Sequence, residues 1–401
     1  MAEQLSSYQL GPEQGSSYQE LECRIDQFDI DPNTPFTPLR IVVMGSGDFA
    51  NDYVKGAIAA GHEVVTAIGP AKQKDKELDK VRQTAKDLNI PDYMFSSLSD
   101  PEMVRLLREE VKPDLIIGAS LTAIIPQEVT DIPELGMWGW HPSRPLEDGY
   151  RGRSAINWQI INEVTDEDGD PAIGMCIYGL GRDNTQIVPK PPLERTKSLP
   201  IGSEENSPND IADKGPILAE KLVKLPEDAR TAAAAFPKVL AKEGVNYLLE
   251  ATNKMAIAKD MGIIFRGQPQ VVGEGNYQPP IEKKHAKIDL TKPAKTVKAT
   301  VDGSSNNPGS WGYDKDGNMV SVYEASIVET QEAQEPGNLV DIVELEEGKG
   351  YVLLGTGEHL LRANTLRDGH MEGSKEIKGK LTPAHQYARE KGWEVGTVVL
   401  K

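Results

Sequence analysis

The chain has 401 residues, of which 38% are hydrophobic and 26% charged, as in an ordinary globular protein with room for two or three domains. Its formal net charge of -18 argues against strong binding to nucleic acid or to an anionic membrane surface. The two cysteines, Cys23 and Cys176, do not make a disulfide framework, so we expect a reducing, cytoplasmic compartment. No apolar run is long enough to predict a membrane-spanning helix, and residues 1–38 lack the pattern of a leader peptide.

The first strong pattern along the chain is a βαβ unit. Residues 39–44 form a short apolar run that predicts a buried parallel strand. A glycine turn and a helix over 50–60 follow, and residues 63–68 predict the second strand.

Strands and helices then continue to alternate. This alternation predicts a Rossmann-like α/β domain, in which helices cover both faces of a mostly parallel sheet. The expected helices span 72–88, 100–110, 154–162 and 226–261, and the expected strands span 113–119, 136–141 and 174–178.

The pattern changes after residue 286, where short strands separated by glycine-rich turns predict a small OB-like β-barrel. These strands span 319–327, 339–345, 351–354 and 359–363, after a helix near 293–301 and before a helix and a final apolar strand within 381–401. The expected division is an N-terminal extension (1–38), a catalytic domain (39–262) with an exposed insertion (189–216), an OB-like domain (263–376) and a C-terminal tail (377–401).

A glycine loop at 45–50 fits the loose dinucleotide-binding pattern. A nicotinamide site also needs a carboxylate near the end of the second strand to hold the ribose, but that strand ends at Ile68, Gly69 and Pro70. We therefore interpret the loop as a tight strand-to-helix turn at the edge where open α/β sheets bind their ligands.

The most specific segment is residues 141–158, HPSRPLEDGYRGRSAINW, which places His-Pro-Ser after a predicted strand and Tyr-Arg-Gly before a predicted helix. With the GRDNTQI loop at 181–187 and the opening MGSGDFA at 44–50, it resembles the folate-dependent formyltransferases. Segments at 285–290, 307–311, 336–337 and 351–363 resemble the C-terminal domain of the same family. The resemblance covers roughly residues 39–375.

One departure from the family pattern is Gly139, which stands where the formyltransferases carry an Asn two residues before the His. The hydrolase domain of 10-formyltetrahydrofolate dehydrogenase also lacks this Asn. The resemblance is therefore nearest to that hydrolase domain and next to methionyl-tRNA formyltransferase. The loop residues 184–186 and two extra residues before Arg151 also differ from the family pattern.

The resemblance implies 10-formyltetrahydrofolate as the formyl donor, with His141 stabilising the oxyanion and Asp183 acting as general base. An imidazole can donate to a developing oxyanion, and a carboxylate can order and deprotonate the nucleophile. The pterin is expected along the loop after the 113–119 strand. The implied folate-binding residues are Leu121, Thr122, Ala123, Ile124, Ile125, Gly139, Ser143, Arg151 and Gly181. For Ser143 a turn-tying role is the stronger interpretation, and for Arg151 holding the loop and binding a carboxylate are equally favoured.

The acceptor stays open between water and an amine. A tRNA acceptor is less favoured, because the insertion at 189–216 mixes acidic and basic residues. A second hypothesis, motivated by Gly139 and the loop at 184–186, is a catalytically degenerate relative with a structural or folate-binding role. The histidines other than His141 show no ligand spacing, so we expect no metal site.

Overall fold

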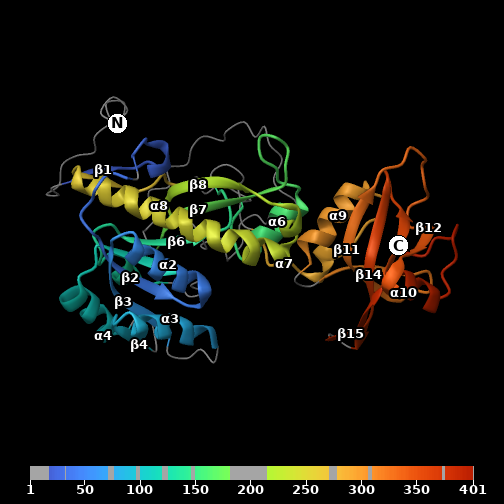
Figure 1. The fold of residues 1–401 in the computed structure, drawn as a ribbon, viewed down its shortest axis with the longest axis horizontal. Coiled ribbons are helices and arrows are strands. Elements are labelled where there is room, and N and C mark those ends of the chain that lie inside the picture. Colours follow the sequence, from blue (N-terminus) through green and yellow to red (C-terminus); the bar gives the residue numbers. More distant parts are fainter. Residues whose placement is uncertain are drawn as a thin grey trace.

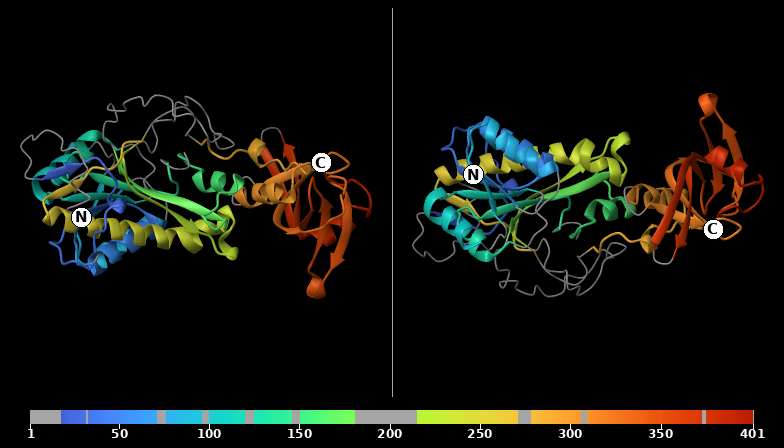
Figure 2. Two further views of the ribbon diagram at one scale, coloured as in Figure 1. Left: turned by 90° about the horizontal axis from the view of Figure 1, so that it is seen from above. Right: turned by 90° about the horizontal axis from the view of Figure 1, so that it is seen from below.

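The computed structural model describes residues 18–31, 33–70, 76–95, 100–119, 125–145, 150–180, 215–270, 278–305, 309–372 and 375–400. The molecule is elongated, with an α/β domain at one end and a β domain at the other (Figure 1). Helices α6 (Ala155–Ile161) and α9 (Ala294–Gly303) lie at the junction in every view (Figures 1 and 2). Within the described ranges, we find no helix with the length and apolar character that a bilayer crossing requires.

A seven-stranded sheet forms the centre of the first domain, in the order β4-β3-β2-β5-β6-β7-β8. The five strands from β4 to β6 run parallel, and β7 and β8 are antiparallel to their neighbours. The mostly parallel α/β fold is therefore confirmed. The strands are β2 (Arg40–Gly45), β3 (Glu63–Pro70), β4 (Asp92–Phe95), β5 (Leu115–Ala119), β6 (Met137–His141), β7 (Ala172–Leu180) and β8 (Ile217–Lys224).

Helices cover both faces of this sheet, because alternate residues of its central strands point to opposite sides. Ile41 and Val43 of β2 join the core beneath α2, α3 and α8, whereas Val42 and Met44 join the core beneath α4, η2 and α5. The helices are α2 (Gly47–Ala59), α3 (Lys76–Asp87), α4 (Pro101–Arg105), π-helical η2 (Leu106–Val111), α5 (Gln127–Thr130), η3 (Glu227–Ala229), α7 (Ala232–Ala235), π-helical η4 (Phe236–Leu240) and α8 (Ala241–Asp260).

The described residues that precede the predicted catalytic domain, 18–31 and 33–38, pack against it. Strand β1 (Gln19–Leu21) pairs in parallel with β9 (Ile263–Phe265), and η1 (Ile25–Gln27) follows. Leu21, Cys23 and Ile25 lie in the same core as α2 and α8. Because β9 belongs to this core, the first domain continues past residue 262.

The second domain contains a six-stranded antiparallel sheet in the order β10-β11-β14-β13-β12, with β15 paired to β14. These six strands do not close into the predicted barrel. Single β-bridges from the C-terminal residues, Asn338 to Val398 and Asp314 to Leu400, lie at the two outer strands. The elements are η5 (Lys283–Ala286), α9, β10 (Ser310–Tyr313), β11 (Met319–Val328), β12 (Leu339–Glu344), η6 (Glu346–Gly348), β13 (Gly350–Gly355), β14 (Leu360–Glu372), β15 (Lys375–Pro383) and α10 (Ala384–Glu390).

The last residues are part of this second domain rather than a separate tail. Tyr387, Ala388 and Trp393 are buried with the side chains of β11, β13 and β14, and Leu400 lies in the same core. The apolar residues near the C-terminus are scattered along the sequence. They did not predict this packing, because the residues they contact lie on strands far away along the chain.

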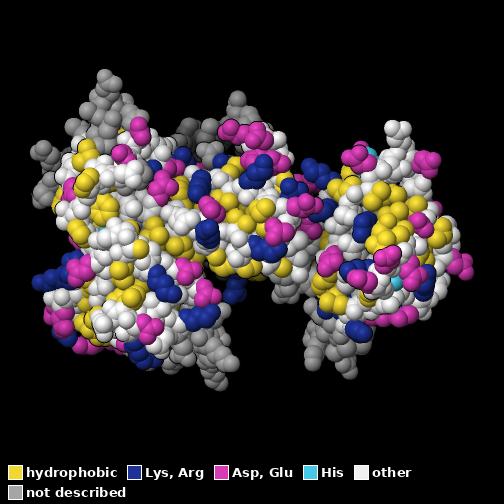
Figure 3. Space-filling model, viewed as in Figure 1, with side chains coloured by type: hydrophobic (Ala, Val, Ile, Leu, Met, Phe, Trp, Pro, Cys, Tyr) yellow, Lys and Arg dark blue, Asp and Glu magenta, His cyan; other side chains and the backbone are white. Residues whose placement is uncertain are grey.

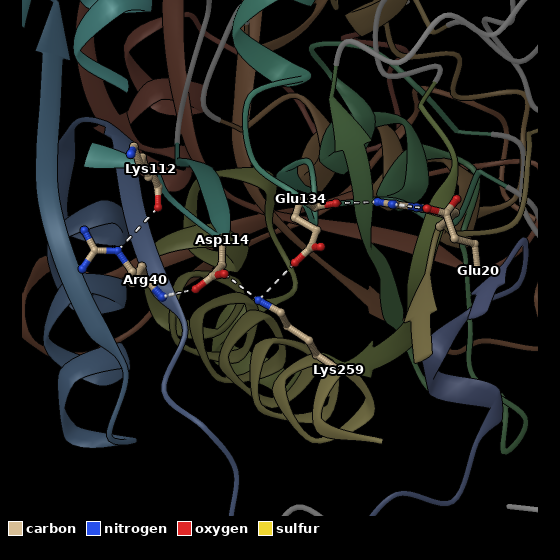
Figure 4. A network of polar contacts seen from close by, with 7 residues as sticks. Glu20, Arg40, Lys112, Asp114, Glu134 and Lys259 are labelled. Atoms are coloured by element: carbon tan, nitrogen blue, oxygen red, sulfur yellow. Dashed lines mark hydrogen bonds and ion pairs between the residues drawn. The ribbon is translucent and has the colours of Figure 1, made fainter. Parts of the chain in front are cut away.

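One ion-pair network ties the amino ends of β2 and β5 to the end of α8 (Figure 4). The Lys259 ammonium lies 2.5 Å from an Asp114 carboxylate oxygen and 3.2 Å from Glu134, and the backbone N–H of Arg40 donates to Asp114 over 2.8 Å. Burial lowers the pKa of Lys259, but the Asp114 and Glu134 carboxylates raise it by more, so the net pKa is above its ordinary value.

We expect Lys259→Met to lower the free energy of unfolding by about 1–2 kcal/mol, because it leaves the partly buried Asp114 carboxylate and the more exposed Glu134 carboxylate without their shared cation. The raised pKa means that the wild-type advantage is full below the unfolded pKa of about 10.4 and is lost as pH rises through the higher folded pKa. Urea unfolding at pH 7 and at strongly alkaline pH measures both effects. The control is Lys295→Met, whose ion pair with Glu163 has a 70% exposed lysine and should contribute almost nothing. Equal losses in the two variants would contradict the prediction.

Candidate active site

The candidate site lies at the carboxyl edge of the parallel strands. Strand β2 ends at Gly45 beside Ala119, the last residue of β5, and β6 runs beside β5 to end at His141. A Cβ on Gly45 would lie 1.8 Å from the Ala119 carbonyl oxygen, so only glycine permits this close approach of the two strand ends. The glycine loop is thus accounted for by backbone packing, at the edge where open α/β sheets bind ligands.

The imidazole of His141 is held at both ring nitrogens. Nε2 lies 3.1 Å from the carbonyl oxygen of Gly152, and Nδ1 lies 2.7 Å from the hydroxyl oxygen of Ser143. A carbonyl can only accept, so Nε2 carries a hydrogen and donates it to Gly152. In the neutral ring, Nδ1 then accepts a hydrogen bond from the Ser143 hydroxyl. The half-buried ring therefore has a defined orientation and a defined tautomer.

The loop that supplies the Gly152 carbonyl is itself buried. Tyr150 is 3% exposed and packs with Trp158 and Ile161, and Arg151 is only 1% exposed. The carbonyl of Arg151 accepts a hydrogen bond from the backbone N–H of Gln278. Both roles considered for Arg151, holding the loop and binding a carboxylate, stay predictions. Ser143 is fully buried; its N–H donates to the carbonyl of His141, and its hydroxyl contacts the imidazole.

Helix α6 anchors the turn after His141 through Gln159, a residue that sequence reasoning missed. The Gln159 side chain is fully buried; it donates to the carbonyl of Pro142 over 2.7 Å and accepts from the N–H of Gly174 over 2.7 Å. The same amide therefore connects the His-Pro-Ser turn to β7. A glutamine on an otherwise apolar helix face was the available signal, but nothing in the sequence named its partners.

The opposite side of α6 contacts the segment that leads into the second domain. Asn157 donates to the carbonyl of Gly303 at the end of α9, Trp158 donates to the carbonyl of Pro279, and the Ser154 hydroxyl accepts from the N–H of Ile281. One short helix thus joins the turn beside His141 to the domain junction.

Besides His141, three predicted site residues are described near it: Gly139 lies on the same strand, Ser143 contacts the imidazole, and Arg151 precedes Gly152, whose carbonyl lies against the ring. Ile125 is described as well and is a buried core residue, 8% exposed. The other predicted residues lie outside the described residues: Leu121, Thr122, Ala123, Ile124, Gly181 and Asp183. Most of the predicted insertion, up to residue 214, also lies outside them, whereas Pro216 accepts a hydrogen bond from the N–H of Gly179 beside β8.

Sequence reasoning also missed Tyr178, which lies directly opposite Gly139 in the β6–β7 ladder and contacts the His141 ring edge-on. The pairing register of two strands is the only signal that could have found it. For the part of the chain that the structure describes, no three His, Cys, Asp or Glu side chains are grouped so as to hold a metal ion.

Comparison with known proteins identifies the family of this fold. A sequence model described as "Formyl transferase" matches residues 39–180, and one described as "Formyl transferase, C-terminal domain" matches residues 280–381. The chain belongs to the formyl transferase family. The two matched regions together cover more than half of its length, and both domains of the structure contain one of them.

Among the relatives of this formyl transferase family member are two methionyl-tRNA formyltransferases. That of Bacteroides thetaiotaomicron is 28% identical over 349 residues, which cover 85% of this chain and 93% of the relative. That of Alkaliphilus oremlandii is 26% identical over 339 residues, covering 82% and 92%. Both carry the name of the branch that the sequence motifs ranked second, behind the dehydrogenase's hydrolase domain.

Solved structures share the fold at low sequence identity. HypX from Aquifex aeolicus in complex with tetrahydrofolic acid superposes with a TM-score of 0.50 at 18% identity over 91% of this chain, which spans about half (51%) of HypX. The sugar 3N-formyl transferase WlaRD, determined with dTDP and 5-N-formyl-THF, has a TM-score of 0.50 at 11% identity and is covered over 97% of its length. These similarities concern the fold.

We expect Gln159→Met to lower the free energy of unfolding by about 2–3 kcal/mol, because it removes the buried amide that serves the Pro142 carbonyl and the Gly174 N–H. Chemical denaturation followed by circular dichroism measures the loss. Gln127→Met is the matched control, since Gln127 is exposed on α5 and should change stability by less than about 0.5 kcal/mol. Two variants of equal stability would show that Gln159 does not anchor the turn.

Proposed function

We propose that this protein transfers the formyl group of 10-formyltetrahydrofolate to an amine acceptor or to water. The observation that carries the proposal is the imidazole of His141, fixed at both nitrogens at the carboxyl edge of a formyl transferase fold. Two structures with this fold were determined with tetrahydrofolic acid or 5-N-formyl-THF, which supports a folate donor.

The reaction begins with attack of a nitrogen or oxygen lone pair on the formyl carbon. The formyl carbon becomes tetrahedral and its oxygen becomes an oxyanion. The His141 N–H stabilises this negative charge. For the Nε2–H to do so, it must exchange the Gly152 carbonyl for the substrate oxygen. Collapse of the intermediate breaks the bond from carbon to N10, and N10 leaves with a proton.

Asp183 takes the proton from the attacking nucleophile and passes it toward N10. We place the pterin along residues 121–125 and assign Gly181 to the same folate site. Ser143 acts on His141 as a positioning residue, and Arg151 holds the loop of Gly152. These assignments rest on the motif resemblance and on the anchoring of the described residues.

The acceptor is small in our preferred form of the proposal. On the face drawn in Figure 3, Lys and Arg side chains are interspersed with Asp and Glu over both domains, and the net charge is -18. A tRNA acceptor instead requires a basic surface to neutralise phosphates. The names of the two methionyl-tRNA formyltransferase relatives keep a tRNA acceptor as the second candidate.

The purified protein should release tetrahydrofolate from 10-formyltetrahydrofolate, either alone or with an amine acceptor, and His141→Ala and Asp183→Asn should each lower kcat at least about 100-fold. Absorbance of the released folate measures turnover. Asp316→Asn, which changes an exposed carboxylate of the second domain, should retain the wild-type rate.

Folate binding without turnover by the wild type, with small amines, water and methionyl-tRNA all offered, would contradict the proposal. That result would favour the degenerate relative, in which the departures at Gly139 and at 184–186 have removed catalysis. Turnover that occurs only with methionyl-tRNA would instead identify methionyl-tRNA as the acceptor.

A further inference from the structure

The side chain of Tyr178 occupies the space beside Gly139 that another residue's side chain would need. The two residues are directly paired in the antiparallel ladder of β6 and β7. A Cβ built on Gly139 would lie 2.9 Å from Cε1 of the Tyr178 ring, 3.1 Å from its Cζ and 3.2 Å from its hydroxyl oxygen. A longer side chain at 139 and the Tyr178 ring in this position therefore exclude each other.

This space is on the same face of β6 as the imidazole. Residues 139 and 141 are two apart on one strand, so their side chains project to the same side. The rings of His141 and Tyr178 meet edge-on, with centroids 6.5 Å apart and planes at 90°. Tyr178 thus brings a phenol hydroxyl from the neighbouring strand to the side of β6 on which His141 acts.

The neighbouring strand is irregular beside Tyr178. Ile177 pairs with Ala219 and Tyr178 with Ile217, so the extra residue of this bulge, Leu218, lies on β8. The Tyr178 side chain as a whole is 9% exposed, and a hydrogen bond to a developing charge is stronger in such a buried environment than in water.

We propose that Tyr178 is a catalytic residue whose phenol hydroxyl donates to the formyl oxygen, in place of the amide that Gly139 lacks. This inference rests on the proposed function. As the nucleophile attacks, the formyl oxygen gains negative charge and the Tyr178 hydrogen bond to it strengthens. Tyr178 keeps its proton throughout. When the intermediate collapses, the electron pair returns to the carbonyl, the bond to N10 breaks, and N10 takes the proton delivered by Asp183.

The pair of residues 139 and 178 therefore works as a unit. In this geometry a donor side chain at 139 needs a small residue at 178, and the Tyr178 ring needs glycine at 139. The arrangement also explains why Gly139 is not simply a lost function in this chain.

The first test is Tyr178→Phe, which keeps the ring and removes only the hydroxyl. We expect kcat with 10-formyltetrahydrofolate to fall by about 100–1,000-fold, while the KM for the folate and the Tm change little, because the donor acts on the transition state. Tyr53→Phe is the matched control. It removes a fully buried phenol hydroxyl on α2, bonded to Thr252 and outside the site, and should retain kcat within about threefold.

The second test restores the donor from the other strand. Tyr178→Ala alone should lower kcat as much as Tyr178→Phe does. The double variant Gly139→Asn with Tyr178→Ala should have a kcat at least about tenfold above that of Tyr178→Ala, because the ring no longer blocks the asparagine. Gly139→Asn in the presence of Tyr178 should gain nothing and should lower the Tm.

The outcomes separate this inference from the proposed function. If the wild type turns over 10-formyltetrahydrofolate and Tyr178→Phe keeps its kcat, the inference is overturned and the proposed function stands. Tyr178→Phe could also lose kcat together with Tm, with no recovery of kcat in the double variant. That result would show a structural role for Tyr178 and would also overturn the inference. A wild type without turnover defeats the proposed function itself, and the inference with it.

Discussion

The hydrogen-bonded pairing of β6 with its two neighbouring strands determines which side chains surround His141. Hydrogen bonds to β5 on one side and to β7 on the other place His141 at the carboxyl edge of the sheet, opposite Cys176 and two residues beyond Gly139. This pairing decides which side chains share a face with the imidazole. The turn after β6 and the carbonyl of Gly152 then hold the ring at both nitrogens and set its orientation.

The site is mechanically connected to the second domain through α6. One face of this helix carries Gln159, which fixes the His-Pro-Ser turn, and other positions carry Asn157 and Trp158, which bond to the chain that enters the second domain. Within the described residues, a single helix of seven residues therefore contacts both the turn beside His141 and the chain at the domain junction.

The sequence predicted those features that depend on local patterns. Apolar runs located β2, β3 and β5, because parallel strands covered on both faces are apolar throughout. The motif at 141–158 located the imidazole and its turn. Strand β8 was missed, since its charged residues Glu220, Lys221 and Lys224 interrupt the apolar run. Tyr178 and Gln159 were missed because their partners are set by strand register and helix docking, which one strand or helix alone does not encode. The predicted barrel was wrong for the same reason: the pairing of distant strands, which decides whether a sheet closes, is not encoded in any one strand.

A crystal structure with a folate that carries a formyl group but cannot transfer it tests the central claim most directly. The account predicts the pterin along residues 121–125, the formyl oxygen within about 3 Å of His141 Nε2 and of the Tyr178 hydroxyl, the Asp183 carboxylate beside the formyl carbon, and a Gly152 carbonyl displaced from the imidazole. A folate bound away from the edge formed by β2, β5 and β6, or bound there with His141 still donating to Gly152, would contradict it.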